Sequence, residues 1–222
     1  MTGWIKLSAG LTEVVSDSGV ASDLTTKMRL KSVCVFCGSN PGIDPIYVEA
    51  ARGLGTAIAS RGMTLVYGGG RVGLMGAIAE AVLGVGGKVI GVIPEALKRR
   101  ELAFETATEL HVVDTMHERK QRMADLSDGF IAMPGGFGTF EEFCEVITWA
   151  QLGVHTKPCG LLNVKGYYDH LLALFDHAVA EQLLLKRNRS IVLTEREAHA
   201  LLEAMARYEA PAVEKWLTSE KT

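Results

Sequence analysis

The chain has 222 residues, a length that suits one α/β domain with extensions better than two complete domains. Hydrophobic residues make up 48% of it and charged residues 22%, which is typical of a protein with a sizeable core and excludes wholesale disorder. Lys and Arg number 23 against 26 for Asp and Glu, so no overall positive field draws the surface to nucleic acid or to an anionic membrane.

Residues 1–29 precede the first apolar run, and we predict that they form an N-terminal arm. Lys, Glu, Asp and Ser interrupt each short apolar stretch in this segment, so it lacks the continuous apolar region of a signal peptide. No stretch of about 18 uncharged apolar residues, long enough for a membrane span, occurs in the sequence. The four cysteines show no paired zinc-ligand spacing, and a chain of this length needs no disulfide staples. We therefore expect a cytoplasmic protein that has no membrane or nucleic-acid partner.

From residue 30 to residue 209, short apolar runs alternate with longer amphipathic segments. The short runs are apolar on both faces, as strands inside a parallel sheet are; they are 32–37, 64–69, 88–94, 109–113, 129–134, 158–164 and 190–194. Helix-length segments lie between them, at 44–60, 74–86, 115–127, 139–152, 167–182 and 195–208. This alternation predicts an α/β fold: a single Rossmann-like, doubly wound parallel sheet with helices on both faces. Residues 210–222 are predicted to be a C-terminal tail.

Three glycine-rich segments follow predicted strands, where open α/β sheets bind their ligands. They are CGSN at 37–40, GGGRVGLMG at 68–76 and PGGFGT at 134–139. The second contains the GxGxxG spacing of dinucleotide-binding proteins, and Glu95 after the next strand is a candidate ribose-binding acid. The alternative interpretation is a tight turn packed closely on the sheet. The spacing alone leaves both interpretations open.

The third segment, PGGFGT, is followed at once by a helix that we expect to begin near Thr139. Gly135, Gly136 and Gly138 allow backbone N–H groups to converge there, and the helix adds unpaired donors and the positive end of its dipole. This combination of donors and dipole favours the binding of a phosphate. The alternative is a capping box, in which Glu142 reaches back only to the turn of Thr139.

A second capping signature, TMHE at 115–118, begins the helix that carries Arg119. Arg119 falls on the same arc as the apolar residues of that helix, so its side chain is directed inward. Either the aliphatic stem packs there while the guanidinium reaches water, or the charge meets a buried anion. Lys120, one step round the helix, is expected to add a second positive charge to the same crevice.

Other chemistries have little support in the sequence. Cys34 and Cys37 form a CxxC, but both fall in the first predicted strand region, where they project to opposite faces and pair poorly. The six histidines include no HExxH or paired ligand spacing, and GxSxG is absent. We expect no metal site and no acyl transfer through serine.

The segments MHERK at 116–120 and PGGFGTFEE at 134–142 resemble the Lonely Guy (LOG) family of cytokinin-activating phosphoribohydrolases. The signature of that family is PGGxGTxxE with an upstream Arg-Lys pair, and the resemblance extends from about residue 31 to 205. It implies hydrolysis of the N-glycosidic bond of a purine (cytokinin-type) nucleoside 5'-monophosphate to free base and ribose 5-phosphate. Neither a metal nor an organic cofactor is required.

Carried over residue by residue, the resemblance implies that Arg119 and Glu142 are the catalytic pair. Cleavage develops positive charge on the ribose and negative charge on the base, so a carboxylate and a cation both lower the barrier. Glu142 would stabilise the sugar, engage its hydroxyls or activate water, and Arg119 would neutralise the base or orient the phosphate. The expected substrate-binding residues are Ser39, Gly69, Gly70, Glu101, Lys120, Gly135, Gly136, Phe137, Gly138, Thr139, Phe140, Glu141 and Thr148.

The predicted helix at 139–152 has two apolar faces. Phe140, Phe143 and Ile147 form one stripe, and Val146 and Trp149 lie on the other side. One face covers the sheet, and we hypothesise that the other packs against a second copy in a homodimer or higher homo-oligomer.

Two alternative functions remain open at this level. The first is a dinucleotide-binding oxidoreductase, based on the GxGxxG spacing, and the second is a nucleotide-binding or carrier protein without turnover. The identity of the base also stays open, because several loops shape the pocket together.

Overall fold

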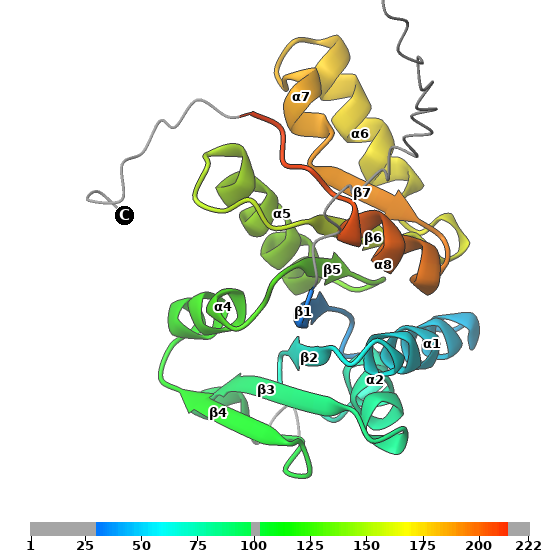
Figure 1. Cartoon of the computed structure of the whole chain (residues 1–222), viewed down its shortest axis with the longest axis vertical. Coiled ribbons are helices and arrows are strands. Elements are labelled where there is room, and N and C mark those ends of the chain that lie inside the picture. Colours follow the sequence, from blue (N-terminus) through cyan, green and yellow to red (C-terminus); the bar gives the residue numbers. More distant parts are fainter. Residues whose placement is uncertain (1–29, 99–102, 213–222) are drawn as a thin grey trace, which may run out of the picture.

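The structure is a computed structural model that describes residues 30–98 and 103–212. These residues form one seven-stranded sheet, in the order β4-β3-β2-β1-β5-β6-β7, in which every neighbouring pair is parallel (Figure 1). The strands are β1 (Ser32–Phe36), β2 (Thr64–Tyr67), β3 (Lys88–Pro94), β4 (Glu109–Val113), β5 (Phe130–Ala132), β6 (Cys159–Leu162) and β7 (Val192–Glu195). The predicted fold class is confirmed. The predicted arm and residues 213–222 of the predicted tail lie outside the described residues.

Each of the six predicted helical segments corresponds to a helix, although two of the helices begin one or two residues before their predicted segments. They are α1 (Ile46–Ser60), α2 (Gly73–Gly84), α4 (Met116–Asp125), α5 (Phe137–Gln151), α6 (Asp169–Ala180) and α8 (Ala198–Ala206). The sequence patterns missed α3 (Glu95–Lys98), the 3-10 helix η1 (Val164–Gly166) and α7 (Lys186–Arg189). These three elements have at most four residues, which is too short for an apolar periodicity to develop.

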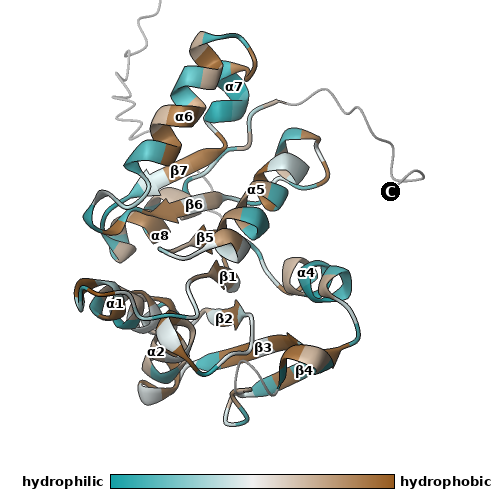
Figure 2. Cartoon of the chain, turned by 180° about the vertical axis from the view of Figure 1, so that it is seen from behind, coloured by the Kyte–Doolittle hydropathy of each residue, from teal (hydrophilic) through white to brown (hydrophobic). Residues whose placement is uncertain are grey.

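Helices cover both faces of the sheet. Side chains of α1, α2 and α8 pack with one face in a first hydrophobic cluster, and side chains of α4 and α5 pack with the other face in a second cluster. Along β1 the side chains alternate between the two, with Val33 and Val35 in the first cluster and Cys34 and Phe36 in the second. Cys37 joins the first cluster, and both cysteines are free, as expected. Figure 2 shows apolar strands at the centre and polar residues on the helices.

The chain reverses its direction across the sheet next to β1. From β1 it builds β2, β3 and β4 toward one edge, and it then returns to place β5 on the other side of β1. The loops that follow β1 and β5 therefore begin side by side at the carboxyl edge and leave toward opposite faces. In an open α/β sheet, this reversal point is where a ligand crevice forms.

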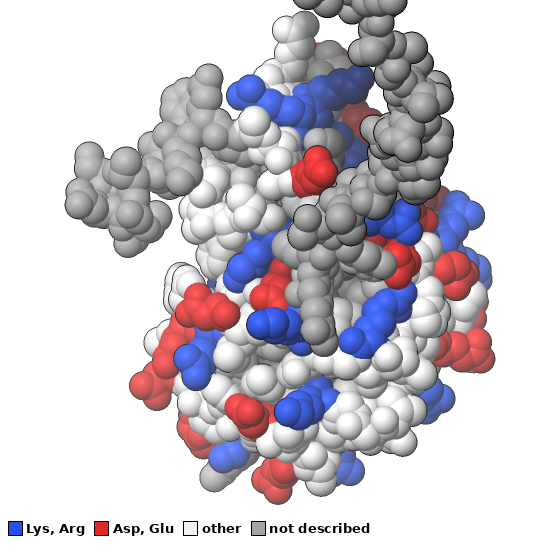
Figure 3. Space-filling view, viewed as in Figure 1, with Lys and Arg blue, Asp and Glu red and all other residues white. Residues whose placement is uncertain are grey.

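The surface carries charges of both signs without a dominant field. Figure 3 shows Lys and Arg interspersed with Asp and Glu over the visible face. Within residues 30–98 and 103–212, no helix has both the length and the apolarity needed to cross a bilayer.

A half-buried histidine ties the end of α5 to the sheet. The Lys157 N–H donates to Nδ1 of His155, so the proton lies on Nε2, which donates to the Val146 carbonyl at 2.9 Å. The imidazole also packs against the ring of Phe130, with 5.2 Å between centroids. Burial lowers the pKa of His155 to about 4.

This depressed pKa predicts a loss of stability in mild acid. The unfolded chain binds a proton near the usual histidine pKa of about 6.5, whereas the folded chain does not bind one until about pH 4. The contribution of neutral His155 to the free energy of unfolding is therefore fully present above about pH 6.5 and is lost as the pH falls toward 4. Urea unfolding should show the advantage of wild type over His155→Gln shrinking by about 1–2 kcal/mol between pH 7 and pH 5, after allowance for partial exposure.

A pH-independent difference for His155→Gln would contradict the assigned proton position.

Candidate functional site

A cavity of about 350 Å³ lies at the point where the chain reverses across the sheet. Its wall combines the end of β1, Gly68 after β2, the start of α5 and side chains from α4. Both glycine-rich loops that flank the reversal point contribute, as does the one after β2. The cavity therefore lies at the carboxyl edge of the sheet, where the sequence predicted the ligand-binding loops.

The loops around the cavity approach one another so closely that side chains are excluded. The Gly38 N–H donates to the Pro134 carbonyl at 3.0 Å, and the Gly38 carbonyl accepts from the Leu74 N–H at 3.0 Å. Gly73 has φ +61°, and a Cβ there would overlap the carbonyl of Ser39. Because backbone packs directly on backbone, the shape of the cavity is set before any ligand arrives.

The start of α5 provides backbone donors without a side-chain cap. The N-cap residue is Gly136, and no side chain of the described residues accepts from the first turn in the way that a capping residue would. Gly136, Phe137, Gly138 and Thr139 all line the cavity. The dipole of this 15-residue helix and its terminal N–H groups therefore favour an anion at this end of the cavity.

The predicted helix start near Thr139 is wrong, and so is the capping box. The helix begins two residues earlier, at Phe137, because Gly136 takes the extended cap conformation with φ −98° and ψ −157°. Thr139 is thus already inside the helix, and Glu142 lies almost one turn beyond it. Glu142 is positioned in the cavity wall and does not serve as a cap.

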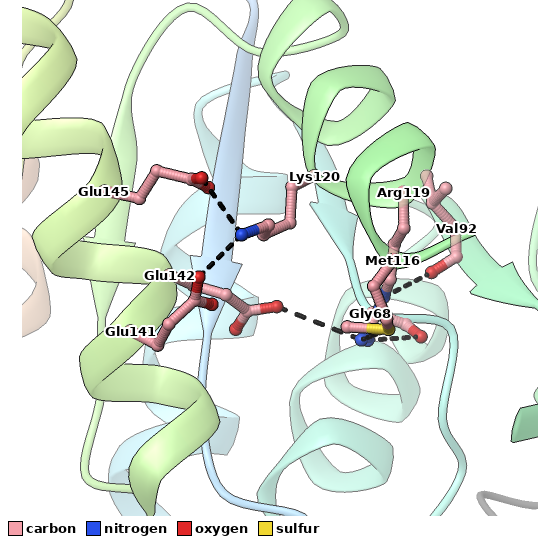
Figure 4. Close-up of polar contacts among 8 residues, drawn as sticks. All are labelled: Gly68, Val92, Met116, Arg119, Lys120, Glu141, Glu142 and Glu145. Atoms are coloured by element: carbon pink, nitrogen blue, oxygen red, sulfur yellow. Dashed lines mark hydrogen bonds and ion pairs between the residues drawn. The ribbon is translucent and has the colours of Figure 1, made fainter.

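Arg119 of α4 is buried and directed inward, so the interpretation that its guanidinium reaches water is wrong. Its Nε donates to the Val92 carbonyl at 3.1 Å, and its Nη2 donates to the Gly68 carbonyl at 3.0 Å (Figure 4). Nη1 lies 3.9 Å from Oε1 of Glu142, whose side chain is 12% exposed. The alternative of a buried anionic partner is therefore confirmed, and Glu142 is such a partner.

The start of α4 fixes the direction of this arginine. The Thr115 side chain accepts from the Glu118 N–H at 3.1 Å, which confirms half of the predicted capping box. The Glu118 carboxylate reaches back to the Asp114 N–H at 3.0 Å, one residue before the cap. Hydrogen bonds thus fix the first turn of α4, and Arg119 is the next residue of the helix after Glu118.

Lys120 does not line the cavity, contrary to the expectation of a second positive charge in the crevice. Its Nζ lies between α4 and α5, 2.6 Å from a Glu141 oxygen and 3.0 Å from a Glu145 oxygen (Figure 4). Partial burial opposes the charge, but the hydrogen bonds to these carboxylates outweigh it and raise the pKa of Lys120. Lys120 therefore joins the two helices that carry Arg119 and Glu142.

The remaining predicted residues divide into two groups. Those in the cavity wall, besides Arg119 and Glu142, are Ser39, Gly136, Phe137, Gly138, Thr139 and Glu141. Those outside it are Gly69, Gly70, Lys120, Gly135, Phe140 and Thr148, whereas Glu101 lies outside the described residues. Thr148 is exposed on α5, two turns beyond the cavity, and donates to the Cys144 carbonyl.

Several wall residues escaped the sequence analysis as site residues. Gly68 is needed because a Cβ would overlap Nη2 of Arg119. Met75, Leu97, Met116 and Met123 form an apolar part of the wall. Met116 and Met123 lie on the same side of α4 as Arg119, and the sequence pattern showed this. The same pattern is also expected of residues that only pack in the core, so it did not identify them as site residues.

A larger cavity of about 980 Å³ lies elsewhere and contains Glu95, the candidate ribose-binding acid. The side chain of Glu95 is 68% exposed there and lies 4.0 Å from Nζ of Lys98. This cavity combines exposed charges of both signs, whereas the smaller one holds the buried Arg119 and Glu142, so we assign the chemistry to the smaller. Within the described ranges, no group of three or more His, Cys, Asp or Glu side chains is arranged to hold a metal ion.

Comparisons with known proteins agree on one family. A family model described as "Possible lysine decarboxylase" matches residues 75–205. The chain is 50% identical over 193 residues to a probable cytokinin riboside 5'-monophosphate phosphoribohydrolase of Oryza sativa subsp. japonica, covering 87% of this chain and 86% of that protein. It is 51% identical over 184 residues to a cytokinin riboside 5'-monophosphate phosphoribohydrolase of Arabidopsis thaliana, covering 83% and 85%.

Solved structures share the fold at lower identity. The molybdenum cofactor carrier protein of Chlamydomonas reinhardtii matches with a TM-score of 0.59 and 21% identity, covering 78% of this chain and 93% of that one. A molybdenum cofactor binding protein of Rippkaea orientalis matches with a TM-score of 0.58 and 22% identity, covering 78% and 91%. At this identity the likeness concerns the Rossmann-like fold alone.

The contact between Gly68 and Arg119 leads to a stability prediction. Gly68→Ala should displace the guanidinium from its carbonyl acceptors and from Glu142, and so lower the free energy of unfolding by about 2–4 kcal/mol. Gly53→Ala on α1 is the matched control, because a Cβ there meets no atom within 4 Å; it should stabilise by up to about 1 kcal/mol. Urea unfolding measures both, and equal effects of the two substitutions would refute the close contact at Gly68.

Proposed function

Since the chain belongs to the Lonely Guy (LOG) family of cytokinin riboside 5'-monophosphate phosphoribohydrolases, we infer that it cleaves a purine nucleoside 5'-monophosphate at the N-glycosidic bond. Water is the acceptor, and the products are the free base and ribose 5-phosphate. The observation that carries this function is the buried Arg119–Glu142 pair, which faces the same cavity as the uncapped start of α5. One cavity thus offers a place for a phosphate and a pair of opposite charges for the bond.

The start of α5 is suited to the 5'-phosphate. Its first N–H groups are backbone donors that need no side chain, and the helix dipole adds to their attraction for an anion. Ser39, from the loop after β1, lines the same cavity and offers a hydroxyl. Binding energy at the phosphate, remote from the bond, then orients the ribose for cleavage.

The two charged residues are suited to the bond itself. As the bond breaks, its electron pair moves to the purine nitrogen and positive charge develops on the ribose. The Glu142 carboxylate stabilises that positive charge or takes a proton from the attacking water, and Arg119 stabilises the negative charge on the purine. Two backbone carbonyls already fix the Arg119 guanidinium, so little reorganisation is needed during the reaction.

The apolar part of the wall is suited to the base. Met75, Leu97, Met116 and Met123 offer a surface against which a purine ring can pack. The thioether side chains adapt to groups of different shape, so this wall accommodates purines with and without an N6 substituent.

The description of the family model raises lysine decarboxylation, which the residues present do not fit. That reaction uses pyridoxal phosphate bound to a neutral lysine amine. Lys120 lies beside the cavity, but two carboxylates hold its Nζ and raise its pKa, which keeps it charged. No step through such a cofactor follows from this site.

The dinucleotide interpretation also lacks support around the GxGxxG spacing. A Cβ at Gly68, the first glycine of this spacing, would overlap Arg119, and a Cβ at Gly73, the last, would overlap Ser39. These two glycines therefore make room for neighbouring parts of the protein, which favours the interpretation as a tight turn.

We also propose that the protein acts as a homodimer in a reducing cytoplasm. Three of its four cysteines are buried, and all four are free thiols. On α5, Phe140 and Ile147 share one stripe and are only half-buried, and Thr148, next to Ile147, is exposed. A second copy packed on this side of α5 would cover these residues and bring Thr148, a substrate-binding position by family resemblance, near the cavity of that copy.

The role of Glu142 is tested by Glu142→Gln, which keeps the size of the side chain and removes its charge. Turnover of AMP and of isopentenyladenosine 5'-monophosphate should fall at least about a hundredfold, the scale of a positioned acid or base. Free base is measured by chromatography, and nucleotide binding should persist. Glu49→Gln, at an exposed position in the first turn of α1 that does not line the cavity, should retain wild-type turnover.

Near wild-type turnover in Glu142→Gln would refute the proposed role of this carboxylate. Nucleotide binding without any release of base by the wild type would instead favour the carrier function.

The assembly is tested by light scattering at micromolar concentration. Because one chain has a mass of 24.0 kDa, a homodimer should scatter with twice that mass. A mass of one chain under these conditions would contradict the homodimer.

A further inference from the structure

Two adjacent tyrosines after η1 hold the backbone of the glycine-rich loop. The Tyr167 hydroxyl donates to the Gly135 carbonyl at 2.6 Å, and the Tyr168 hydroxyl donates to the Met133 carbonyl at 2.6 Å. Neither tyrosine lines the cavity. The loop between β5 and α5 is therefore held from outside the site, by residues more than 30 positions further along the chain.

Aromatic packing fixes the positions of both hydroxyls. The rings of Tyr167 and Tyr168 meet edge to face, with 5.1 Å between centroids. Phe140, from the first turns of α5, stacks on Tyr167 at 6.4 Å and meets Tyr168 edge to face at 6.3 Å. The same group thus contacts the loop at its carbonyls and the following helix at Phe140.

The turn that carries the tyrosines is itself braced by a buried asparagine. Asn163 accepts from the Tyr168 N–H at 2.7 Å and donates to Asp169 at 2.7 Å. Only 4% of Asn163 is exposed, so these bonds are shielded from water. Asn163 therefore fixes the backbone directly after Tyr167, and the ring of Tyr167, which is 39% exposed, is held by its contacts with Phe140 and Tyr168.

The bond from Tyr167 acts on the peptide unit that enters the phosphate site. A peptide unit is planar and trans, so fixing the direction of the Gly135 carbonyl also fixes the opposite direction of the Gly136 N–H. Gly136 is the N-cap of α5 and lines the cavity. Between two glycines this unit would otherwise rotate readily, because no Cβ restricts it.

We propose that Tyr167 is a positioning residue for the 5'-phosphate, because its hydroxyl locks the Gly135–Gly136 peptide unit in the orientation that the anion requires. The proposal rests on the proposed function and adds a residue that touches neither the nucleotide nor the reacting atoms. Its effect is specific to the phosphate, so a nucleoside without that group should not sense the loss of the hydroxyl.

Tyr167→Phe removes only this hydroxyl, and calorimetry in the Glu142→Gln background measures binding without hydrolysis. Affinity for isopentenyladenosine 5'-monophosphate should fall about three- to tenfold, the range of one neutral hydrogen bond. Affinity for isopentenyladenosine, which lacks the phosphate, should change less than twofold. Tyr47→Phe is the matched control, because the Tyr47 ring also packs edge to face on Tyr167 but is bonded to no loop carbonyl in the described structure; it should alter neither affinity.

Unchanged nucleotide affinity in Tyr167→Phe, or equal weakening for nucleotide and nucleoside, would overturn the positioning role. Release of base by wild-type protein, followed in parallel, tests the proposed function separately. If the wild type releases base and either of those results is found, only the positioning role of Tyr167 is refuted. If the wild type neither binds nor cleaves the nucleotide, both the positioning role and the proposed function are refuted.

Discussion

The burial of Arg119 is the constraint on which the site depends. A guanidinium cannot shed its charge, so its burial requires acceptors on every side that it presents, and losing a buried partner costs roughly 3–5 kcal/mol. The Val92 and Gly68 carbonyls and the Glu142 carboxylate meet this requirement from β3, from the loop after β2 and from α5. Satisfying one side chain therefore fixes the relative positions of three segments that are distant in the sequence.

The glycines make this arrangement sterically possible. Gly68 leaves room for the guanidinium, and Gly73 leaves room for the Ser39 carbonyl. At Gly135, a Cβ would overlap the Thr139 hydroxyl at the start of α5. Backbone atoms of these loops therefore form part of the cavity wall. Their peptide dipoles are fixed, and fixed dipoles stabilise developing charge better than groups that must first reorient.

The sequence predicted those features that depend on local patterns. Seven apolar runs placed the strands because a parallel sheet buries both faces of its strands. Local patterns failed where the deciding contact was distant. The apolar arc directed Arg119 inward but left its partners open, because Val92, Gly68 and Glu142 are distant in the sequence, and the start of α5 depends on the extended conformation of Gly136. Tyr167 carried no signal at all, since its partner, Gly135, is 32 residues away.

Charge balance around the cavity favours backbone groups as the donors of the proposed phosphate site. Arg119 and Lys120 bring two positive charges, whereas Glu141, Glu142 and Glu145 bring three negative ones, and ion pairs of 2.6 Å, 3.0 Å and 3.9 Å join them. A phosphate added to this group would meet a net negative charge from these five side chains. Attraction must then come from the N–H groups and dipole at the start of α5, which do not depend on an uncompensated cation. The affinity of the proposed phosphate site then depends on the orientation of its peptide units, so a group that holds such a unit from outside, as we propose for Tyr167, would contribute to phosphate binding without touching the nucleotide.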